Sequence, residues 1–379
     1  MMNSVGMSVA VLVSAAIFAG HGSSVLAAGA VQRLPAKVGM RPIAMPVAVF
    51  GQDEREPPPP RLAKVQQGIG VLFNLRSRTV CTAFCVAPSI IVTAAHCLYR
   101  PTQVGRPRLA DFWFARNYNT SRNYARLAGH DSGSTSQNII AGKTELSTTP
   151  PIDATSDWAA VKLATAVCRG HELQIEAVQP DVINQASKAG RVYQLSYHRD
   201  YQQWKPAYSQ PCRFDRNFGE VTWSQVQKDF SAPDALLLHT CDTGGASSGS
   251  PLLMDAAAGP RVVGVNVGTY VLSKVIVQNG AVAKKLSSQL VANTGVAATA
   301  FHGAIQTLQS ADILEGAAAI RAVQSALERL GLYKAEIDGT YGPILRAAIL
   351  EFERANGMPA TGLPTSTLAQ RLRAMSAAR

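Results

Sequence analysis

The sequence predicts an all-β domain followed by a small all-α domain, and two changes of pattern carry this expectation. From about residue 63 to 280, short β-branched apolar runs are separated by Gly, Pro, Ser and Asn, as in a β barrel or sandwich. From Gly316 onward the apolar residues recur with a helical period. Hydrophobic residues make up 47% and charged residues 16% of 379 positions, which excludes a wholly disordered chain.

The first 27 residues are typical of a secretory signal peptide. An apolar run over Val9–Ala19 is followed by small residues and by the cleavage pattern Val25-Leu26-Ala27. The run is shorter than the roughly 20 apolar residues that span a bilayer. An uncleaved anchor is the alternative, since no Lys or Arg precedes the run. No later segment is long and apolar enough for a membrane span, so we expect a periplasmic or secreted protein in a compartment that permits disulfides.

Residues 28–62 are expected to form a Pro-rich leader or N-terminal extension. They contain the run Pro57–Pro60, which is stiff and extended and cannot lie inside a helix or a central strand. The formal net charge is +11, and residues 33–126 hold 14 basic and 4 acidic side chains, a difference of +10. Such a surface favours anionic partners such as cell-envelope polymers.

The β domain is expected over residues 63–305 and a linker over 306–315. Its strands are predicted at the apolar runs Ile69–Leu75, Phe84–Val86, Ile90–Ala94, Trp158–Leu163, Leu236–Leu238 and Val262–Val267. An Ala-rich stretch from about 281 to 310 shows only a weak pattern.

Three short segments of this domain carry the side chains of a nucleophilic catalyst. His96 ends an apolar strand, Asp157 opens another, and Ser248 lies in the small-residue loop 244–250. A serine hydroxyl becomes a good nucleophile when an imidazole takes its proton, and a buried carboxylate orients that imidazole. Small residues let backbone N–H groups turn inward, so Ala246 and Ser248 are the expected oxyanion-hole donors.

Each triad position except His96 has competitors in the sequence. Asp153 and Asp131 compete with Asp157, which is favoured because an apolar strand follows it directly. Ser247 and Ser250 flank Ser248, which is favoured by the Gly after it and the Pro three positions later.

Two of these motifs resemble those of the trypsin/chymotrypsin-like serine endopeptidases: Thr93-Ala94-Ala95-His96-Cys97 and Ser248-Gly249-Ser250-Pro251. The Ser-Gly-Ser-Pro form is similar to that of the bacterial glutamyl-endopeptidase-like branch. Asp53-Glu54-Arg55 also resembles the mature amino-terminal segment of that branch. The resemblance covers about residues 50–305. It implies a chymotrypsin-like double barrel that hydrolyses peptide bonds through an acyl-enzyme, without a cofactor.

The resemblance also marks a departure and two candidate specificity residues. Ser247 stands where the trypsin branch has the Asp that pairs with a newly cut amino terminus, so activation through that ion pair is not expected. Asp242 has the offset of the trypsin-branch specificity Asp and would select Lys or Arg, or else it braces the loop. Asn266 stands at about the place of a His that binds Glu side chains in the glutamyl-specific branch.

The six cysteines fit the same resemblance. The spacing of Cys81 and Cys97 matches the disulfide that clasps the histidine loop in chymotrypsin-like enzymes. Cys212 and Cys241 are expected to pair near the nucleophile loop, which leaves Cys85 and Cys168. The alternative is a metal site formed by Cys81, Cys85, His96 and Cys97, but this spacing fits no common zinc pattern, and no metal is expected.

Three helices are predicted in the C-terminal region, at Gly316–Leu330, Pro343–Ala355 and Pro364–Met375. The connecting segments Ile337–Pro343 and Asn356–Gly362 resemble the peptidoglycan-binding-like domain, which would cover residues 316–376. Three residues in and beside these segments could contact a ligand or could be turn and core residues: Asp338, Tyr341 and Phe352.

Between residues 100 and 126, arginines interleave with aromatic residues, as in single-stranded nucleic-acid binding sites. In an exported protein we expect a solvated surface there and no nucleic-acid partner. The sequence therefore predicts an exported serine endopeptidase that acts on protein or peptide substrates and is held at peptidoglycan by residues 316–376. The alternative is a non-catalytic envelope-binding protein on a protease scaffold.

Overall fold

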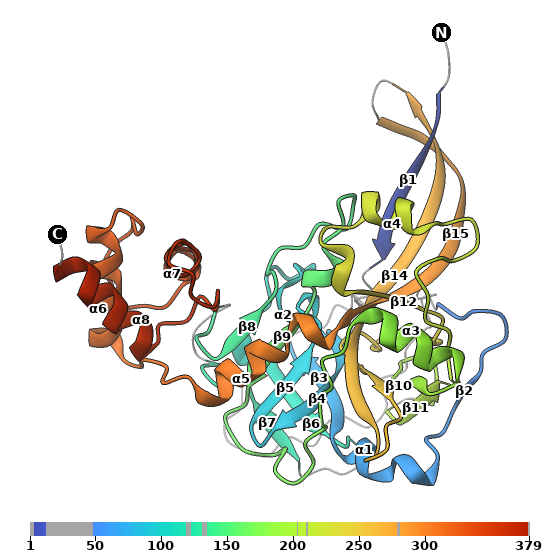
Figure 1. The fold of residues 1–379 in the computed structure, drawn as a ribbon, viewed down its shortest axis with the longest axis horizontal. Helices are drawn as coiled ribbons and strands as arrows, with labels where there is room; N and C mark the ends of the chain where they lie inside the picture. The colour runs from blue at the N-terminus through green and yellow to red at the C-terminus, as the bar shows by residue number, and fades with distance from the viewer. Residues whose placement is uncertain are drawn as a thin grey trace, which may run out of the picture.

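The structure is a computed structural model that describes residues 4–12, 48–118, 123–130, 135–202, 204–209, 211–278 and 281–377. Two curled antiparallel sheets lie side by side, and a group of helices follows them at the C-terminal end (Figure 1). The cleavage pattern expected at residues 25–27 lies outside the described residues, as does Asp131. The expected architecture, a double β barrel plus a helical C-terminal region, is confirmed.

The first sheet carries two of the three triad candidates. Its strands run in the order β7-β6-β3-β4-β5-β9-β8. Their bounds are β3 (Ile69–Asn74), β4 (Val80–Ala87), β5 (Ile90–Thr93), β6 (Phe112–Arg116), β7 (Tyr124–Arg126), β8 (Ile139–Ala141) and β9 (Ala159–Lys162). β5 and β9 pair antiparallel, and Thr93 at the end of β5 lies opposite Ala159 at the start of β9. The segment that follows β5 and the segment that precedes β9 therefore meet at the same end of the two strands.

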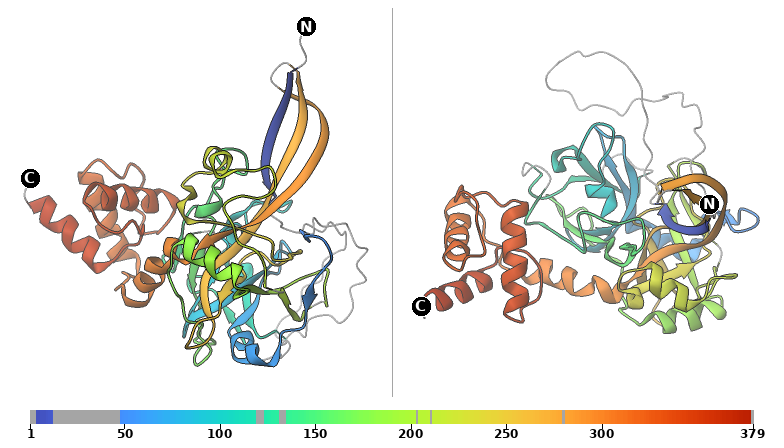
Figure 2. Two further views of the ribbon diagram at one scale, coloured as in Figure 1. Left: turned by 45° about the vertical axis from the view of Figure 1, so that its right-hand side comes forward. Right: turned by 90° about the horizontal axis from the view of Figure 1, so that it is seen from above.

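The second sheet carries the nucleophile loop between two of its strands. Its order is β12-β15-β14-β13-β10-β11-β2, and β1 (Ser4–Leu12) pairs with β14. The bounds are β2 (Arg55–Glu56), β10 (Val192–Tyr197), β11 (Pro206–Ser209), β12 (Leu236–His239), β13 (Pro251–Met254), β14 (Arg261–Gln278) and β15 (Ala281–Ala297). β14 and β15 form a long hairpin that extends beyond the body of the domain (Figures 1 and 2).

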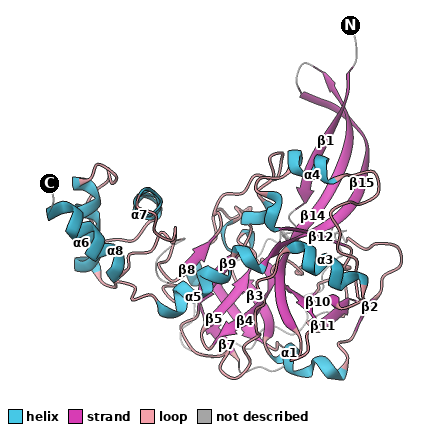
Figure 3. Cartoon of the chain, viewed as in Figure 1, coloured by secondary structure: helices cyan, strands magenta, loops and turns pink. Residues whose placement is uncertain are grey.

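Helices are short within the β domain and longer after it (Figure 3). Their bounds are α1 (Ala63–Gln67), α2 (His96–Tyr99), α3 (Pro180–Lys188), α4 (Trp223–Asp229), α5 (His302–Ser310), α6 (Ala317–Arg329), α7 (Pro343–Ala355) and α8 (Ser366–Ala377). Within the described residues, no helix has the length and apolarity needed to cross a membrane.

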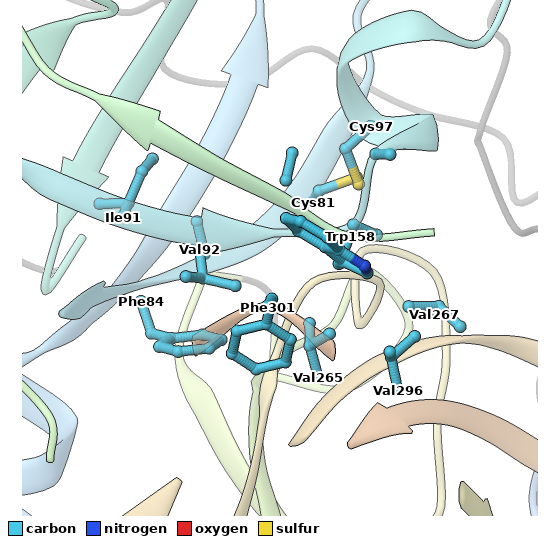
Figure 4. Close-up of a cluster of buried hydrophobic side chains, with 14 of the residues drawn as sticks. Cys81, Phe84, Ile91, Val92, Cys97, Trp158, Val265, Val267, Val296 and Phe301 are labelled. Carbon is cyan, nitrogen blue, oxygen red and sulfur yellow. A yellow bond between two sulfur atoms is a disulfide. The ribbon is translucent and has the colours of Figure 1, made fainter. Parts of the chain in front are cut away.

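One apolar core joins the two sheets. Phe84 of β4 and Val265 of β14 belong to the same buried cluster, and Trp158 lies against Phe301 with ring centroids 6.2 Å apart (Figure 4). Burial of this apolar surface holds the sheets together in a fixed relation. The triad candidates, which come from both sheets, are therefore placed by the same core.

Two segments lie differently from the sequence-based expectation. Residues 281–297, expected to be weakly patterned, form β15 in the interior of the second sheet, and α5 buries Ile305 and Leu308 in the main core. The expected linker at 306–315 therefore begins inside a helix of the β domain. At the other end, residues 48–62 of the expected leader are built into the body, where β2 pairs with β11. Ser4–Leu12, inside the expected signal peptide, form β1.

The C-terminal helices enclose a separate core of their own, in which Ile320, Leu345 and Leu368 are buried. α7 begins and ends where the sequence predicts, and α6 and α8 differ from the expectation by one or two residues at each end. The core gives residues 316–376 the basis for an independent fold, although about 60 residues bury only a marginal core.

Buried polar side chains hold the two signature segments of this region. Gln324 donates to Asp338 Oδ1 at 2.8 Å and accepts from Gly339 N. Glu353 accepts from the N–H groups of Thr361 and Gly362, and burial raises the pKa of its carboxyl group. Tyr341 donates to the Gly362 carbonyl and Phe352 lies in the core, so these residues and Asp338 brace the fold.

Candidate active site

His96 and Asp157 meet where β5 ends and β9 begins. The His96 Nδ1–H donates to Asp157 Oδ2 at 2.7 Å, and the His96 backbone N–H donates to Asp157 Oδ1 at 2.9 Å. Both side chains are almost fully buried, with exposed fractions of 2% and 3%. Because the carboxylate accepts from Nδ1, the proton lies on that nitrogen, and Nε2 keeps the lone pair of a general base.

The competing aspartate Asp153 has other partners. Its carboxylate accepts from Lys143 Nζ at 2.7 Å, from the Ser147 backbone N–H and from the Ser231 hydroxyl. These bonds fix the loop that precedes Asp157 and leave no contact with the imidazole. Of the aspartates in the described part of the chain, Asp157 is the one hydrogen-bonded to His96.

Ser248 lies in the tight loop that leads into β13. The loop is tied to the first sheet, because Thr82 N donates to the Ser248 carbonyl at 2.9 Å and Thr82 Oγ1 donates to the Ala246 carbonyl at 2.8 Å. Gly249 has a φ of +84°, and a Cβ there would clash with the Thr82 carbonyl and the Thr93 hydroxyl. Only glycine fits at this position, which explains the Gly of the motif.

The Cys97 sulfur lies between the His96 imidazole and the loop that carries Ser248. It lies 3.7 Å from His96 Nε2 and 3.9 Å from the Ser248 carbonyl oxygen. No hydrogen bond between the Ser248 hydroxyl and His96 is present among the described residues. Nucleophile-to-base bonds are often long without substrate and tighten in the complex.

The backbone N–H groups of Ala246 and Ser248 are without a protein acceptor in the described residues, as are those of Gly244 and Gly245. The N–H groups that follow the two expected donors are engaged, since Ser247 N donates to the Gly244 carbonyl and Gly249 N to the Asn266 carbonyl. Ala246 has a φ of +82°, which is unusual for a residue with a side chain. Two unengaged donors in a tight loop are what an oxyanion hole requires.

Neither candidate specificity residue presents a free polar group. Both carboxylate oxygens of Asp242 accept backbone N–H groups, from Phe50 and Glu54, each at 2.9 Å. Asn266 Nδ2 donates to the Ser247 carbonyl at 3.2 Å, and its Oδ1 faces His239 Nε2 at 3.2 Å. Of the two roles expected for Asp242, this geometry is that of the loop brace, because its oxygens are already occupied.

The six cysteines form three disulfides: Cys81–Cys97, Cys85–Cys168 and Cys212–Cys241. Cys81 and Cys97 lie next to His96, with candidate ligand atoms of all three within 4.8 Å. A metal-binding cysteine must be a thiolate, and these sulfurs are joined to each other. The alternative metal site is therefore wrong for this oxidised structure.

Several site residues were not found from the sequence. Thr82 reaches the Ala246 carbonyl from β4, far away along the chain, and His239 at the end of β12 contacts Asn266; no local motif marks either residue. The arginine-rich stretch serves the fold: Arg116 is buried and donates to the carbonyls of Val167 and Gln67, and Arg126 lies over the Trp113 ring at 4.9 Å. Arg122 lies outside the described residues.

Comparisons with known proteins give two family matches and one similar solved structure. The family model for the trypsin-like peptidase domain matches residues 81–265, and that for a putative peptidoglycan binding domain matches residues 316–372. A solved structure described as a Glu endopeptidase in complex with MPD aligns at 19% identity and a TM-score of 0.41, covering 69% of this chain and 97% of that one. No curated protein matches the sequence. The chain therefore carries a trypsin-like peptidase domain and, at its C-terminal end, a peptidoglycan-binding-like domain.

Proposed function

We propose that the chain is an exported endopeptidase that cleaves peptide bonds through Ser248, His96 and Asp157 and is held at the cell wall by residues 316–376. The observation that carries the catalytic part is the double hydrogen bond from His96 to the buried Asp157 carboxylate. It fixes the tautomer in which Nε2 can take a proton.

The reaction follows from the placement of these groups. His96 Nε2 removes the Ser248 hydroxyl proton as Oγ attacks the peptide carbonyl carbon, and the Asp157 carboxylate stabilises the resulting imidazolium. The Ala246 and Ser248 N–H groups donate to the oxyanion. The imidazolium then protonates the departing amine, which leaves an acyl-enzyme on Ser248. Water hydrolyses that ester by the same proton transfers.

Three features support the location and the tether. Three disulfides suit an oxidising compartment outside the cytoplasm. The C-terminal helices have their own core and match the peptidoglycan-binding family model. The basic net charge of +11 suits an anionic envelope.

Substitution of each serine in the loop tests the nucleophile. Ser248→Ala is expected to lower kcat on the order of 10⁶-fold, because the acyl-enzyme cannot form. Ser247→Ala and Ser250→Ala are expected to keep part of the activity, since Ser250 Oγ accepts from Gln194 in the buried core and Ser247 Oγ lies 3.4 Å from Asn266. Full activity in Ser248→Ala would remove the proposed triad.

A covalent probe separates the enzyme from the non-catalytic alternative. A sulfonyl fluoride is expected to label the wild-type chain at Ser248 and to leave Ser248→Ala unlabelled. Absence of both labelling and hydrolysis in the folded wild-type chain would favour an envelope-binding protein on a protease scaffold.

A further inference from the structure

Residues 48–56, which we call the strap, lie against the loop that carries the oxyanion-hole donors. Ala48 and Thr243 exchange both backbone hydrogen bonds, at 3.1 and 3.0 Å. At the other end of the strap, β2 pairs with β11, with Arg55 opposite Ser209. The strap is therefore joined by backbone bonds to the loop itself and to the sheet beside it.

Asp242 connects the middle of the strap to the first residues of the loop. Its two carboxylate oxygens accept from Phe50 N and Glu54 N, and its own backbone N–H donates to Ser209 Oγ at 2.9 Å. The residue is only 3% exposed. The two N–H groups supply the hydrogen bonds that a buried carboxylate needs. Moving the strap away would leave the Asp242 charge buried without them, so these bonds hold the strap in place.

Arg55 forms a second, charged connection. Its Nη2 donates to Asp53 Oδ2 at 2.7 Å and to Asp200 Oδ2 at 2.8 Å, and its guanidinium lies 5.1 Å from the centre of the Tyr201 ring. Although burial disfavours the charged guanidinium, the hydrogen bonds to Asp53 and Asp200 raise the pKa of Arg55 above its usual value. The arginine thus joins the strap to the 198–201 loop.

The 198–201 loop holds the Gly245–Ala246 peptide, whose N–H is one of the two proposed oxyanion-hole donors. The Arg199 backbone N–H donates to the Gly245 carbonyl at 2.7 Å. The Asp200 carboxylate lies against Gly244 so closely that a Cβ there would clash with it. In a trans peptide the carbonyl and the N–H point in opposite directions. When Arg199 holds the Gly245 carbonyl, the Ala246 N–H is directed to the opposite side, where it has no protein acceptor.

We propose that Arg55 and Asp242 are positioning residues that hold the Gly245–Ala246 peptide in the orientation catalysis needs. This inference rests on the proposed function. In the trypsin branch, an ion pair between an Asp and a newly cut amino terminus orders this loop. This chain has Ser247 at the position of that Asp, and the strap orders the loop through Arg55 and Asp242 instead. Trimming of the chain beyond residue 56 is therefore expected to lower activity, so processing that yields the active enzyme leaves residues 48–56 in place.

The test compares Arg55→Ala with a matched buried arginine in the full-length chain. Arg116 is as buried as Arg55 and donates to the carbonyls of Gln67, in α1, and Val167, in the segment after β9. Loss of one oxyanion donor costs about 10²–10³ in kcat. Arg55→Ala is therefore expected to lower kcat by about that factor with little change in KM, and Arg55→Lys to recover part of it. Arg116→Ala should lose stability but keep kcat within about 3-fold.

Amide hydrogen exchange supplies a readout that does not depend on activity. Residues 242–248 are expected to exchange faster in Arg55→Ala and in Asp242→Asn than in the wild type and in Arg116→Ala. Equal kcat losses in Arg55→Ala and Arg116→Ala, or unchanged exchange of the loop, would overturn the positioning role. If Arg55→Ala does not fold, Arg55→Lys and Asp242→Asn decide by the same two measurements. If the wild-type chain is inactive but residues 242–248 exchange slowly, and faster in Arg55→Ala, the proposed function is contradicted while the positioning of the loop by the strap is supported.

Discussion

Two buried histidines flank the catalytic loop without belonging to the triad. His239 faces Asn266 through Nε2 and accepts the Cys241 backbone N–H through Nδ1, while His198 lies beside Arg55 and Asp200. Burial lowers the pKa of each from about 6.5 to about 3, and for His198 the nearby Arg55 charge adds to this effect. In the folded chain both imidazoles are therefore neutral above about pH 3.

These pKa values predict how stability depends on pH. Between pH 6.5 and 3 the unfolded chain binds protons at both histidines and the folded chain does not. Their contribution is thus present above pH 6.5 and lost as pH falls, at about 1.4 kcal/mol per pH unit for each histidine. Denaturant midpoints measured from pH 7.5 to 4 should fall less steeply in His239→Gln than in the wild type. The control His302→Gln should keep the wild-type slope, and an unchanged slope in His239→Gln would contradict the assignment.

Residues that act through short local motifs could be predicted, and those that act through distant contacts could not. His96 and Ser248 each lie in a short segment in which the local backbone geometry restricts the neighbouring residue types. Gly249, where only glycine fits, is an example. Asp157 could be favoured because a buried strand follows it. Asp242 and Arg55 could not be placed, because the partners of Asp242 lie 192 and 188 residues away along the chain. The triad therefore remains a prediction from local sequence that the geometry supports.

At the scale of single elements, β4 links two disulfides with different surroundings. Cys81 joins β4 to α2 next to His96, and Cys85 joins the same strand to Cys168 in the segment after β9. The two bridges close segments of 16 and 83 residues. In the chain-entropy model these loops correspond to about 3 and about 4.5 kcal/mol of stability.

Removal of each disulfide should therefore separate stability from activity. Cys85→Ala/Cys168→Ala is expected to lower the free energy of unfolding more, because it releases the longer loop. Cys81→Ala/Cys97→Ala is expected to lower kcat more, because its sulfur lies 3.7 Å from the His96 ring. Urea unfolding and kcat on a small peptide measure the two effects. The same kcat loss in both double variants would show that the bridge next to His96 has no special role.

Elements were predictable where the pattern is strong. α7 and the strands around His96 have long apolar runs or a clear period, and they form where expected. β15 could not be predicted because the buried polar residues Asn293 and Thr294 and Gly295 separate its apolar positions, and Gly295 packs its backbone against Leu252 and the Val265 carbonyl with no room for a side chain. Close packing of this kind leaves no hydrophobic signal in the sequence.

At the scale of the whole molecule, the helical region contacts the first sheet at β8 and at the segment that precedes it. Leu363 is fully buried in the main core, and Arg346 Nη2 donates to the Ala141 carbonyl at 3.3 Å. Gln137 Nε2 donates to the Leu314 carbonyl at 3.3 Å. Few contacts cross this boundary compared with those inside each core, which is usual between domains.

A chain that ends at Ser310 therefore tests whether the two parts have separate tasks. It retains both sheets and α5, so it should hydrolyse a small peptide with nearly unchanged kcat, whereas it should no longer sediment with purified peptidoglycan. The removed residues 311–379 carry 8 basic and 7 acidic side chains, a net charge of +1, and residues 316–379 alone carry +3, so charge attraction is not expected to account for all of the binding.

Salt distinguishes a shaped binding site from a basic surface in that experiment. The Debye length falls from about 10 Å at 0.1 M to about 3 Å at 1 M salt, so attraction between exposed charges is screened at the higher concentration. If residues 316–376 bind peptidoglycan through shape and hydrogen bonds, the full-length chain should sediment with it at both concentrations. Binding lost at 1 M would reduce the region to a generic basic patch. Equal sedimentation of the full-length and shortened chains would move wall binding to the part of the chain before residue 311, where residues 33–126 carry most of the excess positive charge.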